Sequence, residues 1–337
     1  MKIKMLFLCF ITAIGFKNSV LLGNAVDLIP GGQNVGIEIK PDGLIISGTY
    51  DVKIKDSTYN PSKDSDIKRG DILFEVEKQK VSGIEDFSKV FNKYTGTKNE
   101  VEVSLKRKSN VIKRKLRLIK ENNSYKTGLY IKERILGIGT VSFYDPERNI
   151  FGALGHAVVD NDSGNIVEVK EGSIYKSSIT SINKSKDGDP GEKVASFDQN
   201  SQLGTILENT SIGIYGTYNN SKEGLKTMKM ANADEVEVGP AKIYTVIKGN
   251  TVQSFDIKIT SLVKQNICDI KGISFKVIDK TLLNLTGGIV AGMSGSPIIQ
   301  NNMLVGAVTH VLVENVECGY GIYMQWMYEE ALKLINS

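Results

Sequence analysis

Short runs of alternating polar and apolar residues fill the chain from residue 126 almost to its end, and this pattern constrains the fold most. Runs such as GIGTVSFYD, FGALGHAVV and SFDIKITSLV are each about one strand long, and polar turns separate them. Helical periodicity returns only over residues 326–336. The pattern therefore predicts a mainly β barrel or sandwich over residues 126–337, closed by a C-terminal helix.

The first 26 residues have the composition of an export signal or membrane anchor. Lys2 and Lys4 precede an apolar run over residues 5–16, and Lys17 ends that run. The run is shorter than the ~20 apolar residues that a membrane-spanning helix needs. We therefore expect an exported protein that contacts the membrane, if at all, through this N-terminal segment, whether or not the segment is cleaved.

Residues 28–121 read as one compact unit of strands with a single helix. Alternating strands open and close it, and Ile84, Phe87, Val90 and Phe91 have helical spacing before Gly96. The sequence RGDIL at residues 69–73 begins a further strand, and residues 108–110 form the turn of a basic hairpin. The order of these elements resembles a PDZ domain of exported bacterial proteins.

In PDZ domains a loop before the second strand offers backbone N–H groups to the C-terminal carboxylate of a bound peptide. The matching residues here are Val35, Gly36 and Ile37. The resemblance implies that a peptide C-terminus or strand binds at this loop by addition to an exposed sheet edge.

Composition argues against several other functions. The net charge of +4 is small and evenly spread, so it gives no support for a nucleic-acid partner. Cys268 and Cys318 are the two cysteines beyond the N-terminal segment, and they form no CxxC or Cys/His cluster. We expect neither a metal nor a cofactor, and both a disulfide and two free thiols are compatible with the sequence.

The stretch GMSGSP places Ser294 on a bend rich in small residues. A serine nucleophile needs an imidazole to accept its proton and two N–H donors facing the oxygen that becomes negative. The chain contains two histidines, His156 in FGALGHAVV and His310 in VGAVTHVLV. They are therefore the two candidates for the general base.

GMSGSP resembles the nucleophile sequence of chymotrypsin-like serine peptidases, which fold as two β-barrels. That resemblance implies an oxyanion hole formed by the N–H groups of Gly292 and Ser294. It places Thr309 and His310 on the strand that pairs with the substrate backbone, which leaves His156 as the base. Met293 replaces the acid found in many digestive enzymes, so activation by a new N-terminus is not expected.

A closer resemblance covers nearly the whole chain. LIPGGQNVGI, GIGTVSFYDPERNIFGALGH, DPGEKVA, TGGIVAGMSGSPIIQ and VGAVTHV are together similar to stage IV sporulation protein B peptidases of endospore-forming bacteria. The resemblance implies a catalytic set of His156, Asp279 and Ser294. Chemistry alone does not select the acid, because Asp198 and Asp256 also occupy plausible positions.

The family implies an exported serine endopeptidase in the space between the forespore and mother-cell membranes. Such enzymes cut themselves and a membrane-bound regulator of an intramembrane protease, which activates the late mother-cell sigma factor. Two alternatives remain: a non-catalytic PDZ-type docking protein on a peptidase shell, and a quality-control protease, in which the PDZ unit usually follows the peptidase.

Overall fold

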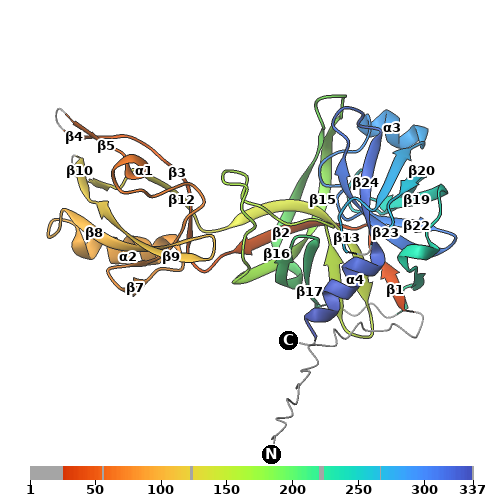
Figure 1. Ribbon diagram of the computed structural model, residues 1–337, viewed down its shortest axis with the longest axis horizontal. Coiled ribbons are helices and arrows are strands. Elements are labelled where there is room, and N and C mark those ends of the chain that lie inside the picture. The colour runs from red at the N-terminus through yellow and green to blue at the C-terminus, as the bar shows by residue number, and fades with distance from the viewer. Residues whose placement is uncertain (1–25, 55–56, 122–123, 220–223, 266, 336–337) are drawn as a thin grey trace, which may run out of the picture.

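The structure is a computed structural model that describes residues 26–54, 57–121, 124–219, 224–265 and 267–335. The predicted export segment lies outside the described residues except for Val26. The described chain is mainly β, as predicted, and it has a C-terminal helix (Figure 1). None of the helices in the described ranges has the length and apolar character needed to cross a membrane.

Six antiparallel strands close into a first barrel, in the ring order β2-β13-β14-β17-β16-β15 and back to β2. Their bounds are β2 Asn34–Lys40, β13 Ile135–Asp145, β14 Ile150–Ala153, β15 Glu171–Asn183, β16 Glu192–Thr210 and β17 Gly213–Tyr218. Alternate residues of these strands, such as Val35, Ile37 and Ile39 of β2, point inward and are buried. The closed ring explains the alternating pattern of the sequence.

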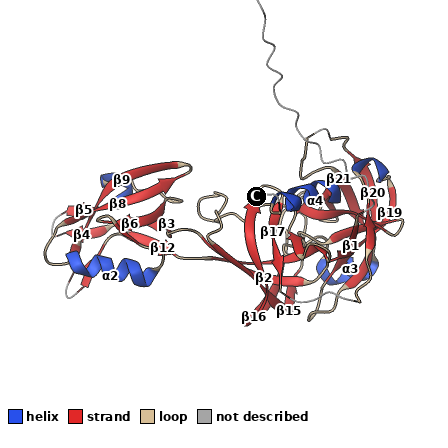
Figure 2. Cartoon of the chain, turned by 90° about the horizontal axis from the view of Figure 1, so that it is seen from below, coloured by secondary structure: helices blue, strands red, loops and turns tan. Residues whose placement is uncertain are grey.

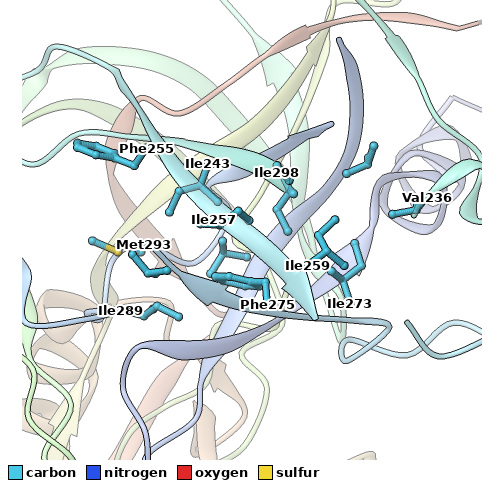
Figure 3. Close-up of a cluster of buried hydrophobic side chains, with 14 of the residues drawn as sticks. Val236, Ile243, Phe255, Ile257, Ile259, Ile273, Phe275, Ile289, Met293 and Ile298 are labelled. Carbon is cyan, nitrogen blue, oxygen red and sulfur yellow. The ribbon is translucent and has the colours of Figure 1, made fainter. Parts of the chain in front are cut away.

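A second barrel closes in the ring order β19-β20-β21-β24-β23-β22. Its strands are β19 Gly239–Thr245, β20 Gln253–Leu262, β21 Ile273–Val277, β22 Pro297–Gln300, β23 Met303–Val311 and β24 Cys318–Tyr323. Figure 3 shows its core, in which Ile243, Ile257 and Phe275 pack together. Ile289 and Met293, from the segment just before Ser294, are buried in the same core.

Short strands and helices complete the two-barrel body. β1 Asp27–Pro30 pairs with β13 and with β18 Met228–Met230, which pairs with β23, so one continuous sheet joins the barrels. The remaining elements are η1 Ala233–Glu235, α3 Lys280–Thr286 and the C-terminal helix α4 Met324–Lys333. α4 packs through Tyr328, whose hydroxyl donates to Asp145 at 2.8 Å. This architecture confirms the predicted double barrel with a C-terminal helix.

Residues 41–134 form a separate β/α unit at one end of the molecule (Figures 1 and 2), which we call the inserted unit. Its main sheet has the order β12-β3-β6-β8-β9, β7 pairs with β6, and α2 packs on the sheet through Phe87, Val90 and Phe91. The elements are β3 Leu44–Thr49, β4 Val52–Ile54, β5 Ser57–Tyr59, α1 Pro61–Asp64, β6 Ile72–Val76, β7 Gln79–Lys80, α2 Ile84–Tyr94, β8 Glu100–Arg107, β9 Asn110–Arg117, β10 Ile119–Glu121, β11 Ser124–Lys126 and β12 Leu129–Lys132.

The helix and the basic hairpin of the inserted unit fall where the sequence predicts them, but the boundaries of the unit do not. β1 and β2, predicted within a unit of residues 28–121, belong to the barrels. β12, predicted at the start of a peptidase domain of residues 126–337, pairs with β3 of the inserted unit. The unit is therefore an insertion between the paired strands β2 and β13 of the first barrel.

The prediction of a carboxylate-binding loop at Val35, Gly36 and Ile37 is wrong in this structure. These residues lie in the middle of β2, where Gly36 is in register with Ile138 of β13 on one side and Tyr175 of β15 on the other. Both edges of β2 are already paired, so a peptide strand has no free edge there.

Candidate active site

Ser294 lies on a tight turn that we call the Ser294 turn, residues 287–296, just before β22. Gly292 and Gly295 have φ values of +90° and +92°, which residues with side chains rarely adopt. A Cβ at Gly295 would lie only 2.0 Å from the carbonyl oxygen of Thr140. Met293 is fully buried and anchors the turn in the second barrel. The glycines of the motif are therefore required by backbone geometry and close approach.

Over residues 291–295 the backbone N–H groups alternate between bonded and free. Met293 N–H donates to Val290 at 3.1 Å and Gly295 N–H donates to Val308 at 2.7 Å. The N–H groups of Gly292 and Ser294 make no hydrogen bond with any described residue. These two free donors are the ones that an oxyanion hole at this turn requires.

Thr140 of β13 joins the Ser294 turn to the first barrel, and the sequence gives no sign of this role. Its hydroxyl donates to the carbonyl of Gly292 at 2.8 Å, and its N–H donates to the carbonyl of Ser294 at 3.1 Å. Its own carbonyl accepts from the N–H of Leu154, two residues before His156. Thr140, which is fully buried, thus fixes the Ser294 turn relative to the end of β14, just before His156.

His156 follows β14 after Leu154 and Gly155, whose φ values of +73° and +72° turn the chain sharply. Its Nδ1 lies 2.9 Å from the carbonyl oxygen of Ala157. A carbonyl can only accept a hydrogen bond, so Nδ1 carries the proton and the basic lone pair is on Nε2. Burial lowers the pKa of His156 below its usual value, and the Ala157 contact offsets only part of this effect.

His156 and Ser294 line the same cavity, which has a volume of about 510 Å³. In this structure the Ser294 hydroxyl donates to the carbonyl of Thr309 at 2.9 Å rather than to His156. A nucleophile–base hydrogen bond is often absent without substrate, and rotation about χ1 redirects a serine hydroxyl. The structure thus brings together the serine and the histidine that the sequence singles out.

Thr309 and His310 lie on β23 in the wall of this cavity, next to Ser294. The rings of His310 and His156 have centroids 5.3 Å apart, and His310 Nδ1 is buried without a hydrogen bond among the described residues. Burial lowers the pKa of His310, and the charge that His156 gains on protonation and the Lys271 ammonium lower it further. His310 is therefore suited to line the cleft as a neutral ring.

The structure does not bring the predicted acid, Asp279, to His156. Asp279 is the N-cap of α3, and its carboxylate accepts from the N–H groups of Leu282 at 3.0 Å and Asp256 at 3.3 Å. It does not line the cavity. The prediction of Asp279 as the third catalytic residue is therefore not supported by this geometry, in which the side chain caps a helix.

The other two candidate acids are also placed elsewhere. Asp198 accepts hydrogen bonds from Asn200 and Ser201 within the β16 segment. Asp256 pairs with Lys242 on the exposed face of the second barrel. Neither residue lines the cavity that contains His156 and Ser294.

Asn209, near the end of β16, is a residue of the site that sequence reasoning missed. Its side chain accepts from the N–H of Val158 at 2.8 Å and donates to the carbonyls of Val158 at 2.7 Å and Val167 at 2.9 Å. Three hydrogen bonds thereby fix the loop after His156, residues 157–170, which we call the His156 loop. An asparagine near a turn is common, so the sequence contains no signal for this role.

The inserted unit also contacts the His156 loop. Lys132 pairs with Asp160 at 2.7 Å and with Asp162, and Arg69 donates to the carbonyl of Asp162 at 3.1 Å. Ile166 of this loop lines both the cavity that contains His156 and Ser294 and a second cavity of about 530 Å³ between the loop and the inserted unit. The unit is therefore in direct contact with one wall of the site.

No three His, Cys, Asp or Glu side chains in the described ranges gather where they could hold a metal ion. Cys268 and Cys318 are both free thiols, and each is partly buried. Burial raises the pKa of Cys268 to about 11, so its thiol stays protonated at neutral pH. Neither thiol lines the cavity that contains His156 and Ser294.

Two six-stranded barrels with a serine turn and a histidine in one cavity form the arrangement of chymotrypsin-like serine peptidases. The protein is a serine peptidase of that class. The family model described as SpoIVB peptidase S55 matches residues 123–328, more than half of the chain, and the chain belongs to that family.

Solved structures similar to this chain are distant from it in sequence. The Rv3671c protease from M. tuberculosis, in its active form, is 14% identical, with a TM-score of 0.35 over 59% of this chain and 74% of that chain. Its inactive form is 15% identical, with a TM-score of 0.33 over 58% and 83%. The HtrA-type protease AlgW with a decapeptide is 9% identical, with a TM-score of 0.36 over 64% and 55%. None of the curated proteins compared with the chain matches its sequence.

Proposed function

We propose that this protein is an exported serine endopeptidase in which Ser294 is the nucleophile and His156 the general base. The observation that carries the proposal is the cavity lined by both residues, at a turn with two free N–H donors. The role of each group follows from its position. Ser294 presents the hydroxyl, His156 presents an unprotonated Nε2, and the N–H groups of Gly292 and Ser294 are free to bind an oxyanion.

The reaction proceeds through an acyl-enzyme. Ser294 Oγ attacks the scissile carbonyl as His156 Nε2 takes its proton, and the carbonyl oxygen becomes negative in the hole formed by Gly292 and Ser294. His156 then gives the proton to the leaving amine. A water molecule, activated by the same imidazole, releases the acyl group and restores Ser294.

The lining of the cavity supports a preference for substrates with an apolar side chain before the cut. Its walls are mainly aliphatic side chains and contain no carboxylate or ammonium group: Val159, Ile166, Ile270, Ile289, Val290, Val308 and Val311. An unpaired charge in such a pocket loses its hydration without gaining a partner. Acidic and basic side chains are therefore poor occupants.

Membership of the SpoIVB peptidase family supports a role in endospore formation. In this proposal the enzyme acts between the forespore and mother-cell membranes and cuts itself and a membrane-bound regulator of an intramembrane protease. That cut would activate processing of the late mother-cell sigma factor.

The inserted unit is proposed to bind a peptide C-terminus or strand in the manner of a PDZ domain. Residues 35–37 take no part in this revised proposal. Support comes from β12, which is an edge strand of the main sheet, and from the N-terminus of α2 close to it: Ile84 N–H donates to Glu133 at 3.1 Å. A free strand edge beside a helix is the surface that strand addition uses.

Mass spectrometry of cleavage products tests the proposed function. Wild-type protein incubated with a mixed peptide library should cut mainly after apolar residues, and Ser294→Ala should cut none of the peptides. Cleavage by Ser294→Ala at the wild-type rate would refute the mechanism. A wild-type protein that binds peptides but cuts none would favour a non-catalytic docking protein.

A further inference from the structure

Lys193 is a buried lysine behind the Ser294 turn, and the mechanism above does not use it. It lies in β16 and is only 5% exposed. Its ammonium nitrogen donates to Asn34 Oδ1 at 3.0 Å and to Thr245 Oγ1 at 2.9 Å. Asn34 belongs to β2 of the first barrel and Thr245 to β19 of the second, so one side chain joins both barrels.

This position is unfavourable for a lysine. Burial lowers its pKa from 10.5 to about 7, and no carboxylate faces it to compensate. Both hydrogen-bond partners are neutral, Asn34 is bonded in turn to Ser177, and the Ser294 turn contains no ionisable side chain. Burying an amine without a counter-charge costs free energy, so stability alone is a weak reason for a lysine at this position.

The position of Lys193 connects it to the proposed oxyanion hole. Its backbone N–H donates to the carbonyl of Ala291 at 2.9 Å, one residue before Gly292. Its methylene stem also lies close to Gly292. A side chain at residue 292 would place its Cβ only 3.2 Å from the Lys193 Cδ. Thr140 bonds the carbonyl of the same glycine at 2.8 Å. Gly292 is thus held by both residues.

We propose that Lys193 is a positioning residue for the hydrolysis: by joining Asn34 to Thr245, its side chain holds the Gly292 N–H in the direction of the developing oxyanion. The inference rests on the proposed function of this turn. A donor fixed before the reaction stabilises the transition state more than the bound substrate. A loosened donor therefore lowers kcat and leaves KM nearly unchanged.

Lys193→Met tests this role, because methionine keeps most of the stem and removes the amine. We expect kcat to fall about 10- to 100-fold, less than the loss of a complete oxyanion donor. KM should change less than about twofold, and affinity for a peptidyl trifluoromethyl ketone, which forms an oxyanion on Ser294, should fall in proportion to kcat. The control Lys258→Met, on the exposed face of β20, should match wild type in kcat, KM and affinity for the trifluoromethyl ketone.

Amide hydrogen exchange of the Ser294 turn provides a readout independent of activity. Residues 290–294 should exchange faster in Lys193→Met than in wild type, whereas the strands of both barrels should not change. Thr245→Val removes one hydrogen-bond partner of the amine and should produce the same effects at smaller size. This second variant decides the question if Lys193→Met does not fold.

The two proposals fail in different ways. A wild-type protein without Ser294-dependent hydrolysis refutes the proposed function, while the exchange measurement still decides whether Lys193 fixes the turn. Unchanged kcat and unchanged exchange in folded Lys193→Met would overturn the inference. A weakening of substrate binding as large as the weakening of trifluoromethyl ketone binding would also overturn it, because such a result indicates a general structural role.

Discussion

The Ser294 turn and the His156 loop line one cavity, but they are held in different ways. The turn is fixed by its own glycines, by a buried Met293 and by hydrogen bonds to Thr140. The loop has a turn of its own, in which the Asp160 carboxylate accepts from Ser163, and partners distant in sequence, among them Asn209 and Lys132, hold that turn in place. Ser294 is thus held by a glycine-rich turn packed against both barrels, whereas the loop beside His156 also depends on the inserted unit.

The largest expected effect separates the two histidines of the cavity. His156→Ala should lower kcat/KM by about 10⁶-fold, because the serine loses its base. His310→Asn should lower it by less than about tenfold, because a neutral lining residue is replaced by another polar one. Steady-state kinetics with one peptide measures both. A larger loss for His310→Asn than for His156→Ala would reverse the assignment of the base.

Gly295→Ala tests the claim that the Ser294 turn needs a glycine where it packs against the first barrel. Its new Cβ would meet backbone atoms of Thr140 at 2.0 Å and Leu154 at 2.5 Å, in addition to the strain of a positive φ. We expect the free energy of unfolding to fall by about 3 kcal/mol or more, with a large loss of activity. Urea denaturation measures the change.

Gly188→Ala is the matched control for that variant. Its φ of +83° is similar, but its new Cβ has no atom within 4 Å. It should lose about 1 kcal/mol from backbone strain alone. Equal losses for the two variants would show that close packing of the turn against the first barrel contributes nothing.

Asn209→Leu tests the support of the His156 loop. The variant keeps the approximate size of the side chain and removes all three hydrogen bonds to Val158 and Val167. Misplacing the loop should lower kcat/KM about 10- to 100-fold. Asn92→Leu, on the exposed face of α2, should have no effect on the kinetics. Wild-type kinetics in Asn209→Leu would show that the loop needs no such support.

The pH dependence of kcat/KM tests the environment of the base. His156 must be unprotonated to accept the serine proton, so activity falls as the pH drops through its pKa. Because burial lowers that pKa, the midpoint of the acid limb should lie below about 6.5. A midpoint at or above this value would show that the imidazole is well hydrated or faces a carboxylate.

Asp279→Asn should have the smallest effect and decides between the family resemblance and the geometry. Asparagine is as good an N-cap as aspartate, so stability and activity should stay near wild type. Asp279→Ala should lose about 1 kcal/mol of stability. A loss of kcat of about 10⁴-fold in a stable Asp279→Asn protein would instead identify a catalytic acid that this structure does not bring to His156.

Local patterns were sufficient to predict a β-rich barrel or sandwich, the C-terminal helix, α2 and the Ser294 turn, whereas the double barrel came from the resemblance to chymotrypsin-like peptidases. Single strands, helices and turns are encoded within about twenty residues, by alternation, helical spacing or glycines at fixed positions. The free N–H groups of Gly292 and Ser294 are likewise a property of one turn. These features could be predicted without knowledge of the rest of the fold.

Features that depend on distant partners could not be predicted in this way. The alternation of residues 34–40 identifies a strand, but not its neighbours, and Gly36 pairs with residues more than a hundred positions away. The same holds for Asn209, which bonds a loop about fifty residues earlier in the chain, and for Thr140 and Lys193, whose roles appear only when the barrels meet. Asp279 differs from these residues: the family resemblance selects it as the catalytic acid, but in the structure its side chain caps helix α3.

The most direct test of the proposed roles of Ser294 and His156 is labelling with a fluorophosphonate, followed by mass spectrometry of the modified peptide. We predict one label per wild-type molecule, located on Ser294, with no label in Ser294→Ala and labelling that is slower by orders of magnitude in His156→Ala. A label on another residue, or wild-type labelling rates in His156→Ala, would contradict these roles.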